Sequence, residues 1–182
     1  MTITEDIRST ITSVREEVAR LHAELPANGL VVWTAGNVSA GCRGPAGDQA
    51  VRCALRRAHP ESMVVCDLDG NLVEGEHSPS SDTAAHAYVY KHMAHVNGVV
   101  HTHSTYATAW AARRESIPCV LTMMADEFGG DIPVGPFALI GDDSIGQGIV
   151  ETLTGHNSPA VLMAQHGPFT IGRSAKPRSR PP

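Results

Sequence analysis

The sequence is short of positive charge. Its 182 residues include 14 Lys and Arg against 19 Asp and Glu, which gives a formal net charge of −5 at pH 7. Proteins that bind nucleic acid or an anionic membrane across a broad surface usually make that surface basic. The composition therefore argues against both kinds of partner. An anionic small molecule would need a local pocket, because no favourable field extends over the whole protein.

Long apolar runs and closely paired cysteines are also missing. No segment approaches the roughly 20 apolar residues that cross a bilayer, and the acid-containing N-terminal stretch does not resemble a signal peptide. We therefore expect a cytoplasmic protein whose cysteines are reduced thiols. The four cysteines, none of them in a C-x-x-C pair, are Cys42, Cys53, Cys66 and Cys119.

Length and composition favour one folded unit. A chain of 182 residues can bury a core of its own, and 42% hydrophobic with 18% charged residues is typical of a soluble, globular protein. No internal repeat or linker divides the chain. We expect a single domain over residues 1–172 and a basic, proline-rich, disordered tail over residues 173–182.

The apolar pattern predicts a mixture of helices and strands. Residues 3–25 carry apolar side chains every three or four positions, which is typical of an amphipathic helix. Two short apolar runs around Asp69-Gly70 indicate a β-hairpin. Further helices are expected over residues 82–95, 105–114 and 144–153, and further strands over residues 30–34, 99–103, 137–140, 159–164 and 169–172.

Two stretches are less regular. Residues 35–39 (Ala-Gly-Asn-Val-Ser) are interpreted as a turn after the strand at 30–34, where Gly36 permits a tight backbone path. Residues 41–48 look like a loop. Residues 49–59 are rich in arginine without clear periodicity, which fits either a basic anion-binding patch or a solvated loop or short helix.

Two histidines stand at the end of the strand expected over residues 99–103. Residues i and i+2 share one face of a strand, so His101 and His103 can present imidazole nitrogens to one metal ion. His166 follows another apolar run and Asp82 stands where a helix begins, and α/β proteins gather ligands at such ends. Three imidazoles with a carboxylate or a water molecule are a common set of ligands for Zn²⁺, although imidazole ligands are also compatible with Mn²⁺ or Fe²⁺. The structural alternative is that Asp82 only caps a helix and His166 only forms loop hydrogen bonds.

Short polar side chains mark two places where a phosphate could bind. Asn37 lies in the glycine-containing turn, whose backbone N–H groups could cradle an anion. Ser80 and Ser81 precede a helix, and a helix N-terminus attracts anions through its free N–H groups and its dipole. Farther along, Asp126 and its acidic neighbour could do general acid–base work, although solvated loop acids are the ordinary outcome.

Together these motifs resemble the class II aldolase/adducin family. The likeness covers roughly residues 3–40 and 60–172, and it implies the family fold, an α/β three-layer sandwich whose mixed, largely antiparallel central sheet is flanked by helices. The four motifs that carry it are Trp-Thr-Ala-Gly-Asn-Val-Ser-Ala at 33–40, Pro-Ser-Ser-Asp-Thr at 79–83, His-Thr-His-Ser at 101–104 and Gln-His-Gly at 165–167.

The resemblance also implies roles for these residues. By analogy with the family, the three histidines bind zinc, while Asn37 and the two serines bind the phosphate of a sugar phosphate. Asp126 corresponds to an acid–base group given across a subunit interface of a homotetramer. The residue after the serines is Asp in the L-ribulose-5-phosphate 4-epimerase branch and Glu in the L-fuculose-1-phosphate aldolase branch, so Asp82 favours an epimerase that works by retro-aldol cleavage and re-addition. An aldolase, a non-catalytic adducin-like relative and an inactive fragment are the alternatives.

Two stretches depart from the family pattern. The family has a Lys-Pro-Ser-Gly strand and turn before the hairpin, and residues 41–59 contain nothing like it. The family also continues past its last strand with helices that carry a second acid–base tyrosine, whereas this sequence ends at Pro182. We hypothesise that both stretches arose from a reading-frame slip in a GC-rich gene or in its sequencing. An intact frame on resequencing the source DNA would reject this hypothesis.

Overall fold

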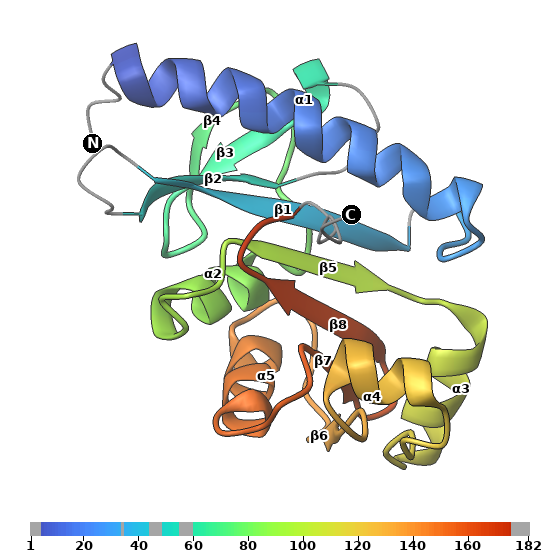
Figure 1. Cartoon of the computed structure of the whole chain (residues 1–182). Coiled ribbons are helices and arrows are strands. Elements are labelled where there is room, and N and C mark those ends of the chain that lie inside the picture. The colour runs from blue at the N-terminus through green and yellow to red at the C-terminus, as the bar shows by residue number, and fades with distance from the viewer. Residues whose placement is uncertain (1–4, 34, 44–48, 55–59, 176–182) are drawn as a thin grey trace.

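The computed structural model describes residues 5–33, 35–43, 49–54 and 60–175, and its described strands form one sheet between helices (Figure 1). The strand order is β4-β3-β2-β1-β5-β8-β7-β6, and all neighbours in it are antiparallel except β6 and β7. The predicted mixed, largely antiparallel sheet is therefore confirmed. The strands are β1 (Gly36–Arg43), β2 (Gln49–Ala54), β3 (Val64–Cys66), β4 (Leu72–Glu74), β5 (Gly98–Thr102), β6 (Val134–Gly135), β7 (Ala160–Met163) and β8 (Gly167–Gly172).

Helices cover both faces of the sheet. The long helix α1 lies across β1 and β2 on one face, and α2 and α5 pack against each other on the opposite face (Figure 1). Helix α3 packs against β7 and β8. No helix among the described residues is both long enough and apolar enough to cross a bilayer. The helices are α1 (Glu5–Ala27), α2 (Thr83–His92), α3 (Thr105–Arg113), α4 (Thr122–Phe128) and α5 (Ser144–Leu153), with a 3₁₀ turn η1 (Pro60–Ser62).

Alternation along the strands divides side chains between the two faces. Val99 packs in the core beneath α2 and α5, and the next residue, Val100, packs against the core beneath α1. Residues paired directly across neighbouring strands share a face. Asn37 of β1 and Phe169 of β8 both pair with His101 of β5, so these three side chains lie together on the α2 and α5 face.

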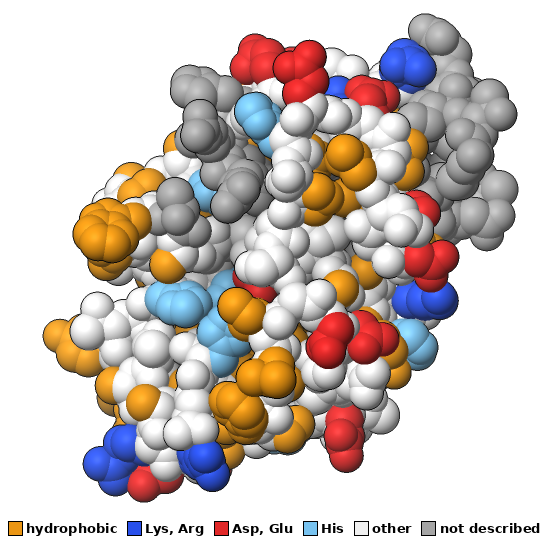
Figure 2. Space-filling model, turned by 180° about the vertical axis from the view of Figure 1, so that it is seen from behind, with side chains coloured by type: hydrophobic (Ala, Val, Ile, Leu, Met, Phe, Trp, Pro, Cys, Tyr) orange, Lys and Arg blue, Asp and Glu red, His pale blue; other side chains and the backbone are white. Residues whose placement is uncertain are grey.

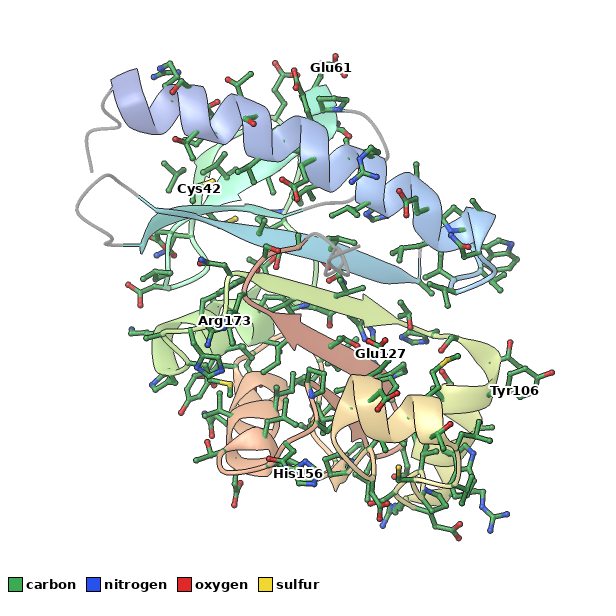
Figure 3. All side chains as sticks on the ribbon, in the orientation of Figure 1. Cys42, Glu61, Tyr106, Glu127, His156 and Arg173 are labelled. Atoms are coloured by element: carbon green, nitrogen blue, oxygen red, sulfur yellow. The ribbon has the colours of Figure 1, made fainter. Side chains whose placement is uncertain are left out.

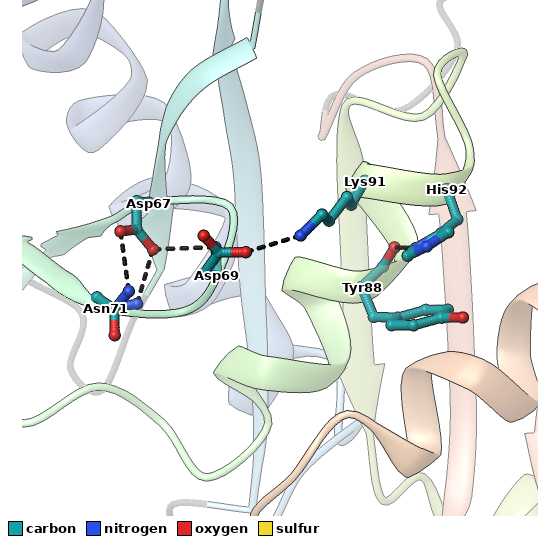
Figure 4. Close-up of polar contacts among 6 residues, drawn as sticks. All are labelled: Asp67, Asp69, Asn71, Tyr88, Lys91 and His92. Carbon is teal, nitrogen blue, oxygen red and sulfur yellow. Dashed lines mark hydrogen bonds and ion pairs between the residues drawn. The ribbon is translucent and has the colours of Figure 1, made fainter. Parts of the chain in front are cut away.

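The hairpin predicted around Asp69-Gly70 is confirmed as β3 and β4. The carboxylate of Asp67 accepts backbone hydrogen bonds from Asp69 and Asn71, both at 2.9 Å, which closes the turn (Figure 4). Lys91 Nζ donates to Asp69 Oδ1 at 2.7 Å, which ties the hairpin to α2. The predicted helices at the positions of α1, α2, α3 and α5 and the strands at the positions of β5, β7 and β8 are confirmed too, with bounds shifted by a few residues.

The strand predicted over residues 30–34 is wrong. The segment turns back instead, with the Ala35 N–H bonded to the Val32 carbonyl at 3.2 Å, and Trp33 is 96% exposed with φ +58°. Thr34 lies outside the described residues. The strand β1 begins at Gly36, where a turn was predicted. The small and polar residues of β1 form a strand because β2 and β5 pair with it on both sides, so tertiary pairing outweighs local propensity.

Residues 41–59 also differ from the prediction. Residues 41–43 belong to β1, and residues 49–54 form β2, which pairs with β1 and β3, so the loop or short-helix interpretation is wrong there. Residues 44–48 and 55–59 lie outside the described part of the chain, as do residues 176–182 of the predicted tail. The anion-binding interpretation of the arginines therefore stays a prediction.

Two further predictions need correction near the C-terminal half of the sheet. Residues 137–140 form no strand, because they have no sheet partner and carry the exposed side chains of Phe137, Leu139 and Ile140. The strand of this region is β6, which pairs in parallel with β7. Asp126 and its neighbour Glu127, for which solvated loop positions were the ordinary expectation, lie instead on the short helix α4.

Candidate metal centre

The three histidines predicted from the sequence come together in the structure. His101 lies at the end of β5, His103 follows it, and His166 lies in the turn between β7 and β8. Their ring centroids are 4.7–5.3 Å apart, and one nitrogen from each ring lies within 4.8 Å of the other two. We call these residues the histidine triad. Figure 2 shows histidine side chains reaching the surface beside one another in a recess on the rear face.

His101 is the most firmly held member of the triad. It is 1% exposed, its ring stacks on Phe169 with centroids 4.1 Å apart, and its Nδ1 lies 3.0 Å from the Pro168 carbonyl. Because a carbonyl can only accept a hydrogen bond, Nδ1 carries the proton and Nε2 keeps its lone pair. That lone pair points toward His103, whose Nε2 is 2.9 Å away. A backbone partner that fixes the tautomer in this way is typical of metal-binding histidines.

The surroundings of two triad members, His101 and His166, disfavour the charged form of the imidazole. Burial above all, and then the neighbouring His166 imidazole, lower the pKa of His101 to about 3, although the hydrogen bond to the Pro168 carbonyl opposes that shift. Burial also lowers the pKa of His166, where the nearby Asp82 carboxylate acts in the opposite direction. Metal binding requires unprotonated imidazoles, so these two ligands need not lose a proton near neutral pH.

The triad fits a divalent ion. Nδ1 of His166 is buried and has no hydrogen-bond partner among the described residues, which is a costly arrangement for a ring nitrogen. Gly167 lets the turn approach β5 closely, since a Cβ there would lie 2.8 Å from the Thr102 carbonyl oxygen. Three imidazoles whose nitrogens converge in this way are the donor set of a catalytic Zn²⁺ site with an open position.

A second polar cluster lies on the same face of the sheet. Asn37 Nδ2 donates to Asp82 Oδ2 at 2.7 Å and to Ser80 Oγ at 3.4 Å, and the Asp82 N–H donates to Ser80 Oγ at 3.3 Å. Asp82 occupies the N-cap position of α2, but its side chain makes no capping hydrogen bond. Its buried carboxylate accepts a hydrogen bond from Asn37 instead, so the Asp82 side chain does not cap the helix.

Not every predicted site residue joins these clusters. The group of side chains placed to hold a metal ion consists of the three histidines and does not include Asp82. The Asp82 carboxylate is nevertheless near enough to His166 to act on its pKa, in the upward direction. Ser81 is exposed, and so is Asp126 on α4, next to Glu127, which Figure 3 labels. Within the described part of the chain, no hydrogen bond or ion pair joins Ser81 or Asp126 to the triad.

Sequence reasoning missed the residues that support the triad. Phe169 was expected only as a strand residue, and its stacking on His101 depends on the β5–β8 register. Gln165 precedes His166 with φ +60°, and nothing in its residue type signals that conformation. Gly167 carried a signal, because a glycine beside a ligand indicates a close backbone approach.

Comparison with known proteins gives the family of this chain. The class II aldolase and adducin N-terminal domain matches residues 16–177, which is most of the sequence. The chain belongs to the class II aldolase/adducin family. The resemblance inferred from the four motifs is thus confirmed at the level of the family. As a class II aldolase-family enzyme, the chain presents a triad consistent with the divalent metal site typical of that family.

Solved structures agree with this assignment. An L-fuculose 1-phosphate aldolase is 28% identical with a TM-score of 0.78, and the match covers 88% of this chain and 75% of that one. YgbL from Klebsiella pneumoniae, described as an aldolase, epimerase or decarboxylase, is 29% identical with a TM-score of 0.74, over 91% of this chain and 81% of that one. An L-fuculose-1-phosphate aldolase from Thermus thermophilus shares the fold at 22% identity and a TM-score of 0.68, over 93% of this chain and 82% of that one.

Proposed function

We propose that this class II aldolase-family enzyme breaks and re-forms a carbon–carbon bond of a ketose phosphate, with the outcome of an L-ribulose-5-phosphate 4-epimerase. The observation that carries the proposal is the position of the histidine triad beside the buried carboxylate of Asp82 on one sheet face. The β1–β5 register supports this position, because Asn37, the partner of Asp82, pairs directly with His101. Zn²⁺ is the proposed ion, with Mn²⁺ and Fe²⁺ as alternatives.

The triad would hold the ion in a fixed geometry. A divalent ion there would act as a Lewis acid toward a ketone oxygen and its neighbouring hydroxyl, and so lower the free energy of the negative charge that develops during bond cleavage. His101 is fixed by its hydrogen bond to Pro168 and by the ring of Phe169. His103 and His166 are only half-buried, which leaves the proposed ion accessible to a substrate.

The proposed phosphate pocket is formed by Asn37, Ser80 and Ser81 at the start of α2. The Asn37 amide reaches both the Ser80 hydroxyl and the Asp82 carboxylate, so these groups lie within one hydrogen-bonded cluster. The N-terminus of the ten-residue helix α2 adds a positive dipole end, which favours an anion. Asp82 would either move a proton or ligate the ion, because its carboxylate is buried beside both His166 and the pocket.

We further propose that the enzyme is a homo-oligomer, with a tetramer as the expected form, in which Asp126 completes the site of a neighbouring subunit. Asp126 lies on α4, and large apolar side chains on and beside this helix are exposed by 63–74%, as expected of a surface that a partner covers. A solution mass equal to one 19.3 kDa chain would contradict this proposal. The exposed apolar residues are Val120, Leu121 and Met123.

The deciding experiment is a zinc assay followed by a turnover assay. Protein that is loaded with zinc, as measured by elemental analysis, is incubated with L-ribulose 5-phosphate. We expect the C4 epimer of the sugar to form. Absence of turnover by zinc-loaded protein on both ribulose and fuculose phosphates would exclude the proposed reaction and favour the non-catalytic or inactive alternatives.

An aldolase is the second candidate. Its support is the 28% identity to an L-fuculose 1-phosphate aldolase over 88% of this chain. The two reactions share the cleavage step and differ in the fate of the aldehyde, which an aldolase releases. Retro-aldol fragments that accumulate from L-fuculose 1-phosphate, without an epimer from L-ribulose 5-phosphate, would select the aldolase.

Asp82→Asn tests the role of the buried carboxylate. The substitution keeps the shape and one acceptor oxygen but removes the charge and the proton-transfer capacity, so we expect kcat/KM to fall by roughly 10²–10⁴-fold, the usual value of general acid–base catalysis. Zinc content should persist if Asp82 moves a proton and should fall if it ligates the ion. The exposed Asp69→Asn in the hairpin is the control and should leave turnover unchanged. Turnover by Asp82→Asn at the rate of the unsubstituted enzyme would remove Asp82 from the chemistry.

A further inference from the structure

The residue before the third histidine has an unusual backbone conformation. Gln165 has φ +60°, in the left-handed region that residues with a side chain rarely adopt. Such a conformation persists only where the surrounding contacts impose it, and it clusters at functional sites. Among the described residues other than glycine, positive φ angles occur only at Trp33, Arg114 and Gln165.

Two of these three residues are bonded to each other. Arg114 Nη2 donates to Gln165 Oε1 at 2.6 Å, and the Gln165 N–H donates to the Ala111 carbonyl at 2.8 Å. Arg114 is the C-cap residue of α3, with φ +59°, and its own N–H also donates to the Ala111 carbonyl, at 3.1 Å. The left-handed cap of α3 and the left-handed turn before His166 therefore form one hydrogen-bonded unit, which we call the α3 clamp (Ala111, Arg114 and Gln165).

The clamp joins parts of the metal centre that are distant in sequence. Helix α3 begins at Thr105, two residues after His103, and its other end holds the residue adjacent to His166. The turn is held from its other side as well, since Gly167 lies against the Thr102 carbonyl at the end of β5. The spacing between the second and third histidines is thus set through the length of α3 and through the end of β5.

We propose that Gln165 and Arg114 are positioning residues of the metal centre, which fix His166 relative to His101 and His103 through α3. Neither residue touches the ring nitrogens of the triad, so the effect passes through the backbone of the turn. This inference rests on the proposed metal site. A metal site binds tightly when its ligands are already placed, and loss of the groups that orient ligands weakens metal affinity about 10–100-fold.

The test compares metal affinity in a small set of variants of the full chain. Gln165→Ala removes the side-chain contact while keeping the unfavourable φ, and Arg114→Ala removes only the other partner. Gln165→Gly also loses the contact but relieves the backbone, because glycine adopts positive φ readily. Arg113→Ala is the matched control, since Arg113 is an exposed neighbour that pairs with Glu115 and not with the turn.

We expect the dissociation constants of Zn²⁺ and Co²⁺ to rise about 10-fold in Gln165→Ala and Arg114→Ala, within the range for groups that orient ligands. Gln165→Gly should have an intermediate affinity, and Arg113→Ala should match the unsubstituted protein. The visible absorption bands of bound Co²⁺ should also change in the first two variants, because they report ligand geometry. The double variant Arg114→Ala/Gln165→Ala should bind no more weakly than the worse single variant, since the two residues act as one unit.

Each outcome has a distinct meaning. If the unsubstituted protein binds zinc, and Arg114→Ala and Gln165→Ala bind it equally well with an unchanged Co²⁺ spectrum, the clamp is only a surface contact and the inference is overturned. If the unsubstituted protein binds no metal, the proposed function fails instead. The melting temperature of metal-free Arg114→Ala is compared with that of the metal-free unsubstituted protein. Equal melting temperatures would show that the loss of metal affinity comes from positioning, because a purely structural role would lower both the metal affinity and the melting temperature.

Discussion

Replacing His103 with alanine is expected to leave the protein without bound zinc and without turnover. The triad supplies three imidazoles, and the alanine would leave a site with two. Even groups that merely orient a ligand change metal affinity about 10–100-fold, so loss of a ligand should cost at least about 100-fold. Elemental analysis after dialysis and calorimetric titration with Zn²⁺ measure the effect directly.

His95→Ala is the control for this substitution. His95 is exposed in the segment after α2, outside the triad, and its loss should leave zinc content unchanged. His103 is half-buried rather than part of the core, so the variant should fold, and its melting temperature can be compared with that of metal-stripped unsubstituted protein. Undiminished zinc in His103→Ala would refute the site.

The metal-free protein is expected to lose stability as the pH falls from 6.5 toward 3. Burial lowers the pKa of His101 from 6.5 to about 3. Between these two pH values the His101 imidazole is therefore protonated in the unfolded chain but remains neutral in the folded protein. Above pH 6.5 the imidazole is neutral in both states and its contribution is fully present. As the pH falls, the free energy of unfolding should decrease by up to about 1.4 kcal/mol per pH unit, on the order of 5 kcal/mol in total. Burial lowers the pKa of His166 too, which adds in the same direction.

Urea denaturation in the presence of a chelator, repeated between about pH 7 and pH 4.5, measures this slope. His101→Asn removes the titrating ring, so the free energy of unfolding should vary less with pH. The variant should also be less stable than the unsubstituted protein at neutral pH. The exposed His77→Asn should keep the slope of the unsubstituted protein. A His101→Asn slope identical to that of the unsubstituted protein would show that the buried ring does not control the acid response.

Much of the triad was predictable from sequence because its signals are local. The alternation of a strand places His101 and His103 on one face, and an apolar run before His166 places it at a strand end. Helices with an apolar repeat and the hairpin at Asp69-Gly70 were predictable for the same reason. Each of these features depends on neighbours within a few positions along the chain.

The errors lie where partners distant in sequence decide the structure. Residues 30–34 are apolar enough for a strand, but nothing pairs with the described ones among them, so Val32 and Trp33 are exposed in a turn. Residues 36–43 have weak strand propensity, yet β2 and β5 pair with them on both sides. The same limit applies to the site, because the Asn37–Asp82 hydrogen bond depends on the β1–β5 register and on where α2 begins.

The positions of the three histidines along the chain have a consequence for how the protein unfolds. His101 and His103 lie at the end of β5, whereas His166 lies beyond α3, α4, β6, α5 and β7. An ion bound to all three would hold the two ends of that long segment together in the folded state, and its binding free energy would stabilise that state because the unfolded chain has no such site. Scarcity of the ion would therefore loosen the half of the sheet around β6, β7 and β8 first, while the half beneath α1 would keep its own core.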